Sequence, residues 1–275
     1  RRRDHRGRPS LTAAAAGIET AHDGQETRAA AGLFTRMRPN LLLTIDVGNT
    51  NITLGLFEGE RLGARWRLAT AHDRMADEYG LQMLGLLNHS GCSPSQLEGI
   101  CLGSVVPPLT GRLIQACRQY LSDNILVIDH TVETGVPVLY DDPRAVGADR
   151  ILDAVAVVER YGGPACVVDF GTATTFDAIS AEGAYLGGAI FPGIGISADA
   201  LFARAAKLPR VELEAPGKVI GTNTVHSIQA GLVYGYVSLV EGMIERFRQV
   251  LGPDMKVIAT GGLAEIIARE TDSLQ

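Results

Sequence analysis

The feature that most constrains the fold of this chain is a short residue pattern that occurs twice. An apolar segment leads into Asp46-Val47-Gly48 and a polar cluster, and the same order of residue types recurs at Asp169-Phe170-Gly171, a constant offset of 123 positions. A second apolar segment follows each copy, which predicts an antiparallel β-meander at both places. Because helices and further strands are expected after each meander, we predict two α/β halves of similar build that divide near residues 150–165.

The spacing of apolar residues predicts the other elements. In the first half it predicts strands at 41–47, 52–57, 62–68, 99–108 (ending at two prolines) and 124–129, and helices at 75–89 and 109–121. Further on it predicts a helix at 148–163, the second meander within 164–190, a Gly/Pro-rich loop at 187–197, a helix at 197–206, an extended loop at 207–224, a long helix at 224–252, and a strand, a glycine turn and a helix start within 256–267. We therefore assign residues 41–155 to an N-terminal half and residues 156–275 to a C-terminal half.

The first forty residues differ in composition from the rest. They contain eight arginines and four acidic residues, a net charge of +4, which leaves −10 for the other residues because the whole chain carries −6. They are rich in Ala and Arg but lack the long apolar region of a secretion signal. We expect residues 1–40 to be a disordered extension and the folded structure to begin near Asn40, just after Met37, a natural initiator.

The composition disfavours several classes of protein. The chain has 275 residues and is 46% hydrophobic, which suffices for one large domain or two modest ones. A net charge of −6 argues against a nucleic-acid-binding face, and no apolar run reaches the ~18 residues that span a bilayer. Four cysteines without a C-x-x-C pairing are typical of reduced, buried thiols. We therefore expect a cytoplasmic protein without a nucleic-acid or membrane partner.

The Asp-x-Gly turn has two interpretations. Glycine lets backbone N–H groups converge on one point, and Asn and Thr side chains add donors, so the set suits phosphate oxygens. Asp46 would be repelled by a phosphate unless a cation or a water lies between them. The same residue types also make an ordinary polar turn. A second copy at a matching position favours phosphate binding.

Residues 146–150 also have two interpretations. Gly147 and Ala148 are small enough for a ligand to approach closely, and Asp149 and Arg150 begin a predicted helix. An Asp at this place is a favoured helix cap. It is also suited to accept a hydroxyl proton while it positions a nucleophile for phosphoryl transfer.

Two further polar clusters could contact ligands. Residues 169–175 offer one carboxylate and three threonine hydroxyls, an oxygen-only set that suits Mg²⁺ or K⁺ rather than zinc. In residues 221–224, Thr224 is equally well interpreted as a helix N-cap or as a ligand donor. The chain contains no G-x-x-x-x-G-K-[ST] motif and no G-x-G-x-x-G motif after a strand, so any nucleotide must bind through a different backbone loop.

Seven motifs that occur in order together resemble the type III pantothenate kinase family. They are DVGNTN, GSVVPP, GADR, VVDFGTATT, GGAIFPGI, AAKLPR and ATGGLA. The resemblance runs from about residue 41 to the end of the chain, and residues 1–40 have no counterpart in the family. The family usually continues with a last strand and helix beyond this point, so the resemblance implies that the C-terminal half is truncated.

The resemblance implies a fold and an activity. The fold would be α/β and actin-like, as in sugar and acetate kinases, with two ribonuclease-H-like halves and a nucleotide cleft between them. The activity would be ATP-dependent phosphorylation of pantothenate to 4'-phosphopantothenate, the first step of coenzyme A biosynthesis. Family members are homodimers, so a homodimer is the expected state.

The resemblance also implies roles for particular residues. The ATP phosphates would bind to Asp46, Val47, Gly48, Asn49, Thr50, Asn51, Ile52 and Thr53, with a further ATP contact from Thr172. Asp149 would be the catalytic base on the pantothenate hydroxyl. Pantothenate would bind to Tyr140, Gly147, Ala148, Asp149, Arg150 and Thr224. Asp169 would hold a monovalent cation, K⁺ or NH₄⁺, and Mg²⁺ would accompany ATP.

Two other functions remain open from the sequence. Some relatives of the family are described as accessory factors for transcription, and such a regulator could keep the fold while losing the catalytic groups. The presence of Asp46, Asp149 and Asp169 favours the enzyme. A kinase for another alcohol is disfavoured because GADR and AAKLPR match the named family.

Overall fold

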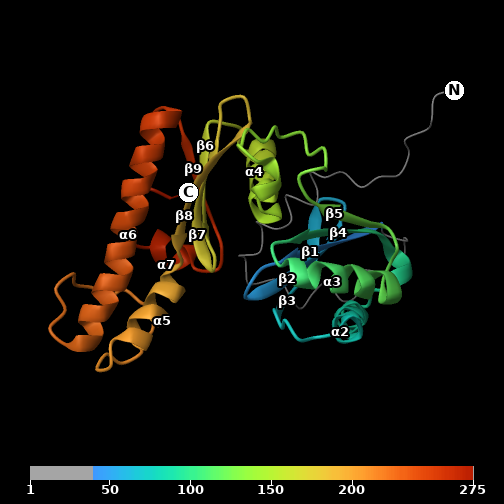
Figure 1. The fold of residues 1–275 in the computed structure, drawn as a ribbon, viewed down its shortest axis with the longest axis horizontal. Helices are drawn as coiled ribbons and strands as arrows, with labels where there is room; N and C mark the ends of the chain where they lie inside the picture. Colours follow the sequence, from blue (N-terminus) through green and yellow to red (C-terminus); the bar gives the residue numbers. More distant parts are fainter. Residues whose placement is uncertain (1–39, 275) are drawn as a thin grey trace. The chain divides into compact units, whose positions relative to one another are not determined.

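A computed structural model describes residues 40–274, which form two compact units (Figure 1). Of these residues, the first unit contains 40–135 and 144–156, and the second contains 136–143 and 157–274. The expected disordered extension lies outside the described residues, apart from Asn40.

The first unit is built on a five-stranded sheet. Its strands are β1 (Leu41–Val47), β2 (Asn51–Glu58), β3 (Arg61–Ala69), β4 (Leu97–Ser104) and β5 (Ile125–Ile128). They lie in the order β3-β2-β1-β4-β5. The first three strands form the predicted antiparallel meander, while β4 runs parallel to β1 and β5 runs parallel to β4. Parallel pairing brings the carboxyl ends of β1 and β4 to one edge of the sheet.

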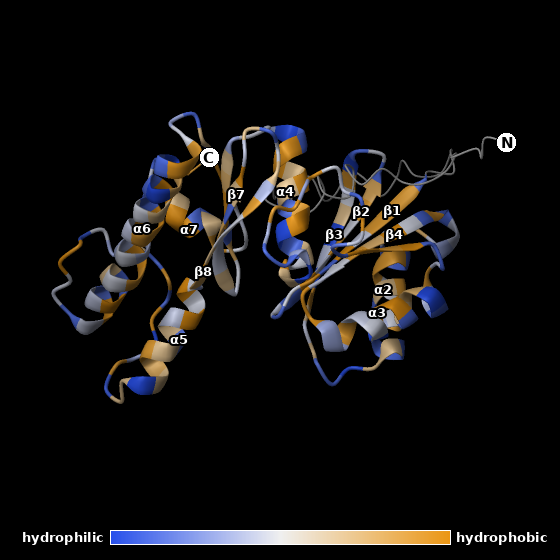
Figure 2. Cartoon of the chain, turned by 45° about the horizontal axis from the view of Figure 1, so that its top comes forward, coloured by the Kyte–Doolittle hydropathy of each residue, from blue (hydrophilic) through white to orange (hydrophobic). Residues whose placement is uncertain are grey.

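Two helices cover one face of this sheet (Figure 1). They are α2 (Ala76–His89) and α3 (Pro107–Tyr120). Ile45, Leu54 and Leu102 from three adjacent strands pack in one core with Tyr79 of α2 and Leu113 of α3. Figure 2 shows β1 and β4 as predominantly hydrophobic, as expected for strands buried in the middle of a sheet.

The second unit repeats this plan with four strands. They are β6 (Ala165–Phe170), β7 (Ala173–Ile179), β8 (Tyr185–Pro192) and β9 (Lys256–Thr260), in the order β8-β7-β6-β9. Its helices are α5 (Ile194–Arg204), α6 (Thr224–Leu251) and α7 (Ala264–Ala268). The core joins Phe170 and Phe176 of the sheet to Ile194, Val240 and Ile267 of these three helices.

The internal repeat predicted from the sequence is confirmed. Each sheet contains an antiparallel meander of three strands. The first strand of the meander also pairs, on its other edge, with a parallel strand from later in the chain, β4 beside β1 and β9 beside β6. Asp46 is the penultimate residue of β1, and Asp169 is the penultimate residue of β6. A further helix, α4 (Ala148–Arg160), leads along the chain from the first unit into the second.

Two element predictions are wrong at prolines and glycines. The predicted strand at 99–108 ends at Ser104, and the two prolines begin α3 instead, because the first turn of a helix does not need their missing N–H groups. The predicted loop at 187–197 is the second part of the edge strand β8 followed by the start of α5. Pro192 is tolerated as the last residue of a strand at the edge of the sheet.

None of the helices within residues 40–274 combines the length and the apolar composition that crossing a membrane requires.

Candidate active site

Asp46 lies where three strands of the first sheet come side by side. It pairs with Thr53 on β2 and with Gly103 on β4, one residue before β1 ends. The next residue of β1, Val47, pairs with Ser104, and its carbonyl accepts a hydrogen bond from Val105 N at 3.0 Å. The strand register therefore places the carboxylate beside the end of β4.

The turn after Asp46 exposes some of its polar groups and uses others internally. The N–H of Gly48 donates to Asn51 O at 3.0 Å, so in this conformation it is engaged within the turn. Asn49, Thr50 and Asn51 are exposed. Of the eight residues expected to bind phosphates, Val47 and Ile52 have fully buried side chains and could contribute only through their backbones.

Asp149 is in the first turn of α4, and small residues bring that turn close to β4. A Cβ on Gly103 would come within 2.8 Å of Leu152 Cδ1, so glycine at this position lets α4 approach the strand. A Cβ on Gly147 would lie 2.5 Å from Asp149 Oδ1. The same oxygen accepts a hydrogen bond from Arg150 N at 2.8 Å. Because α4 begins at Ala148, Asp149 is the second residue of the helix and not its N-cap, so the cap interpretation is wrong and the proton-acceptor interpretation stays a prediction.

Asp46 and Asp149 are close enough to affect each other's charge. Burial is the larger cause, and the negative charge of Asp149 the smaller, of a rise in the pKa of Asp46 from 3.8 to about 7. Such a pair of carboxylates with a perturbed pKa is typical of catalytic sites. Two of the residues expected to bind pantothenate beside Asp149 are buried. Ala148 and Arg150 have only 6% and 8% of their surfaces exposed.

In the second unit, glycines surround the turn after Asp169. Gly171 N donates to Ala173 O at 3.0 Å, which closes the turn, and Thr172 is exposed at its tip. Gly261 adopts a φ of +95°, and a Cβ there would come within 2.4 Å of Asp169 Oδ1. A Cβ on Gly193 would lie 2.4 Å from Thr172 O. These close approaches require glycine, so backbone groups can lie next to the carboxylate and the turn.

Tyr140 packs on the second sheet. Its ring centroid is 6.3 Å from that of Tyr185, and it lies against Gly187, where a Cβ would be 3.1 Å from Tyr140 Cε2. Tyr185 is buried and donates a hydrogen bond from its hydroxyl to Asp177 Oδ1 at 2.9 Å. Tyr140 itself is 39% exposed, so part of its ring is open to a ligand.

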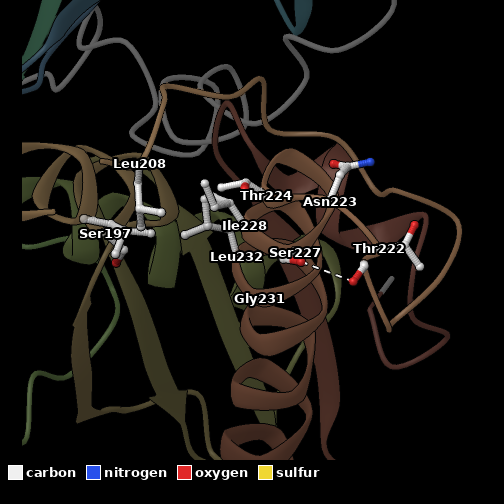
Figure 3. A pocket seen from close by; sticks show the side chains of 11 residues that line it. Ser197, Leu208, Thr222, Asn223, Thr224, Ser227, Ile228, Gly231 and Leu232 are labelled. Carbon is white, nitrogen blue, oxygen red and sulfur yellow. Dashed lines mark hydrogen bonds between the residues drawn. The ribbon is translucent and has the colours of Figure 1, made fainter. Parts of the chain in front are cut away.

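Thr224 lines a pocket of about 890 Å³ at the start of α6 (Figure 3). Ile228 and Leu232 of α6 face Ser197 and Leu208 across it, as Figure 3 shows. Asn223 is the helix N-cap, because its side chain accepts a hydrogen bond from His226 N at 2.9 Å. The N-cap interpretation of Thr224 is therefore wrong, and its exposed side chain stays a candidate ligand donor.

The described residues offer oxygen ligands for cations rather than a closed metal cage. Within residues 40–274, no three His, Cys, Asp or Glu side chains gather to hold a metal ion. Mg²⁺ in kinases is bound by one or two carboxylates together with the substrate phosphates, so Asp46 fits this role. Asp169 offers a carboxylate, a hard oxygen ligand, and the monovalent cation expected there stays a prediction.

The expected pantothenate residues belong to different units. Residues 147–150 are in the first, while Tyr140 and Thr224 are in the second. Their assembly into one site, and the nucleotide cleft between the halves, stay predictions. The residues of the GSVVPP motif have no predicted function, although Ser104 pairs with Val47, which directly precedes the turn from Gly48 to Asn51.

The two sheets define a class of protein, the actin-like fold with duplicated ribonuclease-H-like halves. A solved structure assigned to the Baf family of transcriptional activators from Campylobacter jejuni is 22% identical, has a TM-score of 0.52, and aligns over 84% of this chain and 89% of its own. The ethanolamine utilization protein EutJ from Carboxydothermus hydrogenoformans is 14% identical with a TM-score of 0.50, over 84% of this chain and 80% of its own. At these identities the likeness shows the fold alone.

Sequence comparison identifies the family. The model of the type III pantothenate kinase family matches residues 42–246. A type III pantothenate kinase from Moorella thermoacetica is 54% identical over 85% of this chain and 92% of its own length. One from Myxococcus xanthus is 53% identical over 85% of this chain and 91% of its own. The chain belongs to the type III pantothenate kinase family, and it is a kinase.

Replacing Asp46 tests its electrostatic environment. Its folded pKa near 7 lies above 3.8, so the folded state holds an extra proton between these values and stability falls as the pH rises through that window. Asp46→Asn should therefore stabilise the ligand-free protein at about pH 8, by on the order of 1–3 kcal/mol, and have little effect at about pH 4. Urea unfolding at several pH values measures this difference.

The matched control is Asp123→Asn, at an exposed aspartate of the same unit. This variant should change stability little at any pH. An Asp46→Asn variant that is less stable than the parent at about pH 8 would contradict the account.

Proposed function

We propose that this chain transfers the γ-phosphoryl group of ATP to the hydroxyl of pantothenate, forming 4'-phosphopantothenate in the first step of coenzyme A biosynthesis. The observation that best supports this function is the pairing of Asp46 and Asp149 at one edge of the first sheet. One carboxylate adjoins the phosphate-binding turn, and the other begins α4. Phosphoryl transfer needs these two functions, nucleotide binding and activation of the hydroxyl, at neighbouring positions.

Asp149 is the catalytic base in this proposal. Its Oδ1 already accepts a hydrogen bond from Arg150 N, which holds the carboxylate at the helix start. The carboxylate therefore lies in the first turn of α4, where the helix dipole favours a negative charge. It would orient the pantothenate hydroxyl and receive its proton as the phosphoryl group is transferred.

The turn from Asp46 to Thr53 binds the ATP phosphates in this proposal. Asn49 and Asn51 contribute exposed side-chain donors. A raised pKa at Asp46 is consistent with a place beside phosphate oxygens, where a carboxylate is favoured only when protonated or paired with a cation. Bound Mg²⁺ would neutralise the negative charge of the phosphates, with Asp46 among its ligands.

Residues of both units bind pantothenate, contact ATP and hold the monovalent cation in this proposal. Gly147, Ala148 and Arg150 adjoin Asp149, while the half-exposed ring of Tyr140 and the pocket around Thr224 supply apolar and hydroxyl contacts for pantothenate. Thr172 would contact ATP, and Asp169 would hold K⁺ or NH₄⁺. Four buried, unpaired cysteines support a cytoplasmic location.

The alternative, a transcriptional accessory factor, has weaker support. The Baf family structure is only 22% identical, whereas relatives above 50% identity are named as kinases. The presence of all three aspartates expected of the enzyme also supports it; Asp46 and Asp169 lie near the ends of their strands and Asp149 in the first turn of α4.

Removal of the base tests the proposal. Asp149→Asn keeps the size of the side chain but cannot accept the proton, so we expect turnover to fall by about 10²–10⁴-fold while ATP binding survives. ADP formation should be measured with and without pantothenate, in K⁺ and in Na⁺, and ATP binding by calorimetry.

The Asp123→Asn variant is the control and should retain activity. Near-normal turnover by Asp149→Asn would contradict the base assignment. ADP formation that is absent or does not depend on pantothenate in the folded parent protein would contradict the proposed function itself.

An exposed face of α6 supports the expected homodimer. Small residues follow one another along it at Ser227, Gly231, Gly235, Ser238 and Gly242. A Cβ at each of these three glycines would meet nothing within 4 Å, so the face has room for another backbone. Val219 and Ile220 border it and are 72% and 79% exposed, an apolar exposure that a second copy of the chain would cover.

A bulky residue on this face should dissociate the dimer. We expect Gly235→Leu to shift the protein from dimer to monomer in size-exclusion chromatography with light scattering, because the side chain prevents close approach of the helices. Gly111→Leu on α3, where a Cβ also meets open space, is the control and should stay dimeric. A parent protein that is monomeric, or a dimer that tolerates Gly235→Leu, would contradict this proposal.

A further inference from the structure

A threonine outside the family motifs contacts the phosphate-binding turn directly. Thr70 follows the last residue of β3, and its Oγ1 donates a hydrogen bond to Gly48 O at 2.7 Å. Its backbone N–H donates to Thr50 O at 3.0 Å. One residue therefore holds two of the carbonyl groups of the four-residue turn from Gly48 to Asn51.

These two bonds fix the direction of the N–H groups in the turn. A trans peptide is planar, and its C=O and N–H point in opposite directions. When Thr70 holds Gly48 O, the N–H of Asn49 in the same peptide group points away from Thr70. The bond to Thr50 O fixes the direction of the Asn51 N–H in the same way. The backbone N–H groups of Asn49 and Asn51 therefore have a defined orientation before any ligand binds.

The segment that carries Thr70 is itself anchored to both helices of the first unit. The hydroxyl of Tyr79, which is fully buried in α2, accepts a hydrogen bond from Ala71 N and is also 3.0 Å from Ala71 O. On α3, Arg112 Nη1 donates to His72 O at 2.7 Å. Thr70 thus joins the turn to a segment held by the core, which limits how far the turn can move.

We infer that Thr70 is a positioning residue that holds the Gly48–Asn51 turn in the conformation that binds nucleotide phosphates. The inference rests on the proposed role of this turn in ATP binding. Thr70 does not contact substrate in this account. It acts by keeping the amides of Asn49 and Asn51 oriented, so that their alignment costs little free energy when ATP binds.

The test compares variants that differ only in this hydroxyl. Thr70→Val keeps the shape of the side chain and loses the donor to Gly48 O, so we expect KM for ATP to rise about 5- to 20-fold, with KM for pantothenate nearly unchanged. Thr70→Ser restores the hydroxyl and should stay within about 3-fold of the parent. The affinity for a non-hydrolysable ATP analogue, measured by calorimetry, should follow KM for ATP.

The matched control is Thr44→Val on the same hairpin. Thr44 is buried, and its Oγ1 donates to Gly55 O at 3.2 Å, away from the turn. Its loss should lower the thermal unfolding temperature without changing KM for ATP. If Thr70 were merely structural, both variants would change stability and neither would change ATP affinity selectively.

Several outcomes would overturn the inference. The inference fails if Thr70→Val binds ATP as tightly as the parent, or if Thr70→Ser does not restore the ATP affinity. It also fails if Thr44→Val weakens ATP binding as much as Thr70→Val does, or if the parent protein does not bind the analogue. If Thr70→Val does not fold, Thr70→Ala takes its place, and failure of both to fold would assign Thr70 a structural role only. A parent protein that binds the analogue but shows no pantothenate-dependent turnover would contradict the proposed function and leave the inference to be decided by the binding data.

Discussion

The proximity of two carboxylates, Asp46 and Asp149, is the interaction on which the first unit's site depends. It arises from the strand register, because β4 runs parallel to β1 and pairs Gly103 with Asp46. Gly103 in turn lets Leu152, and with it the start of α4, come close to the sheet. The two acids therefore lie near each other although about a hundred residues separate them in the chain. Their repulsion is a cost of the folded state, and it is consistent with a site that gains stability when a cation and a nucleotide bind.

The second unit has the same strand arrangement but different neighbours around its aspartate. Asp169 occupies the position of Asp46 in the repeated plan, but it pairs with Thr260 on the parallel strand, and Gly261 lies against its carboxylate. The glycines around it bring backbone groups close to its oxygens. One duplicated architecture thus places an aspartate at the same strand position in both units but gives the two carboxylates different neighbours.

Much of this plan could be predicted from the sequence because the determining signals are local. Apolar runs before Asp46 and Asp169 gave both meanders, and the periodicity of apolar residues gave the long helix α6. Local signals failed at Pro107 and Pro108, since proline can follow a strand or begin a helix, and only tertiary packing decides between them. They also failed at residues 187–197, where edge-strand pairing overrides the glycine and proline content.

The details of the site depend on contacts that local patterns do not contain. The hydrogen bond from Thr70 to Gly48 O joins residues 22 positions apart, and no residue pattern indicates it. The engaged N–H of Gly48 and the buried side chains of Val47 and Ile52 depend in the same way on strand register. A motif can therefore identify the turn, while the folded chain determines which of its groups face a ligand.

The interaction between the two carboxylates can be measured directly. The side-chain carboxyl of Asp46, labelled with ¹³C, should titrate by NMR with a pKa near 7 in the ligand-free protein, and at a lower value in Asp149→Asn because the neighbouring charge is gone. An Asp46 pKa near 4 in the parent protein, or one that does not respond to Asp149→Asn, would contradict the account.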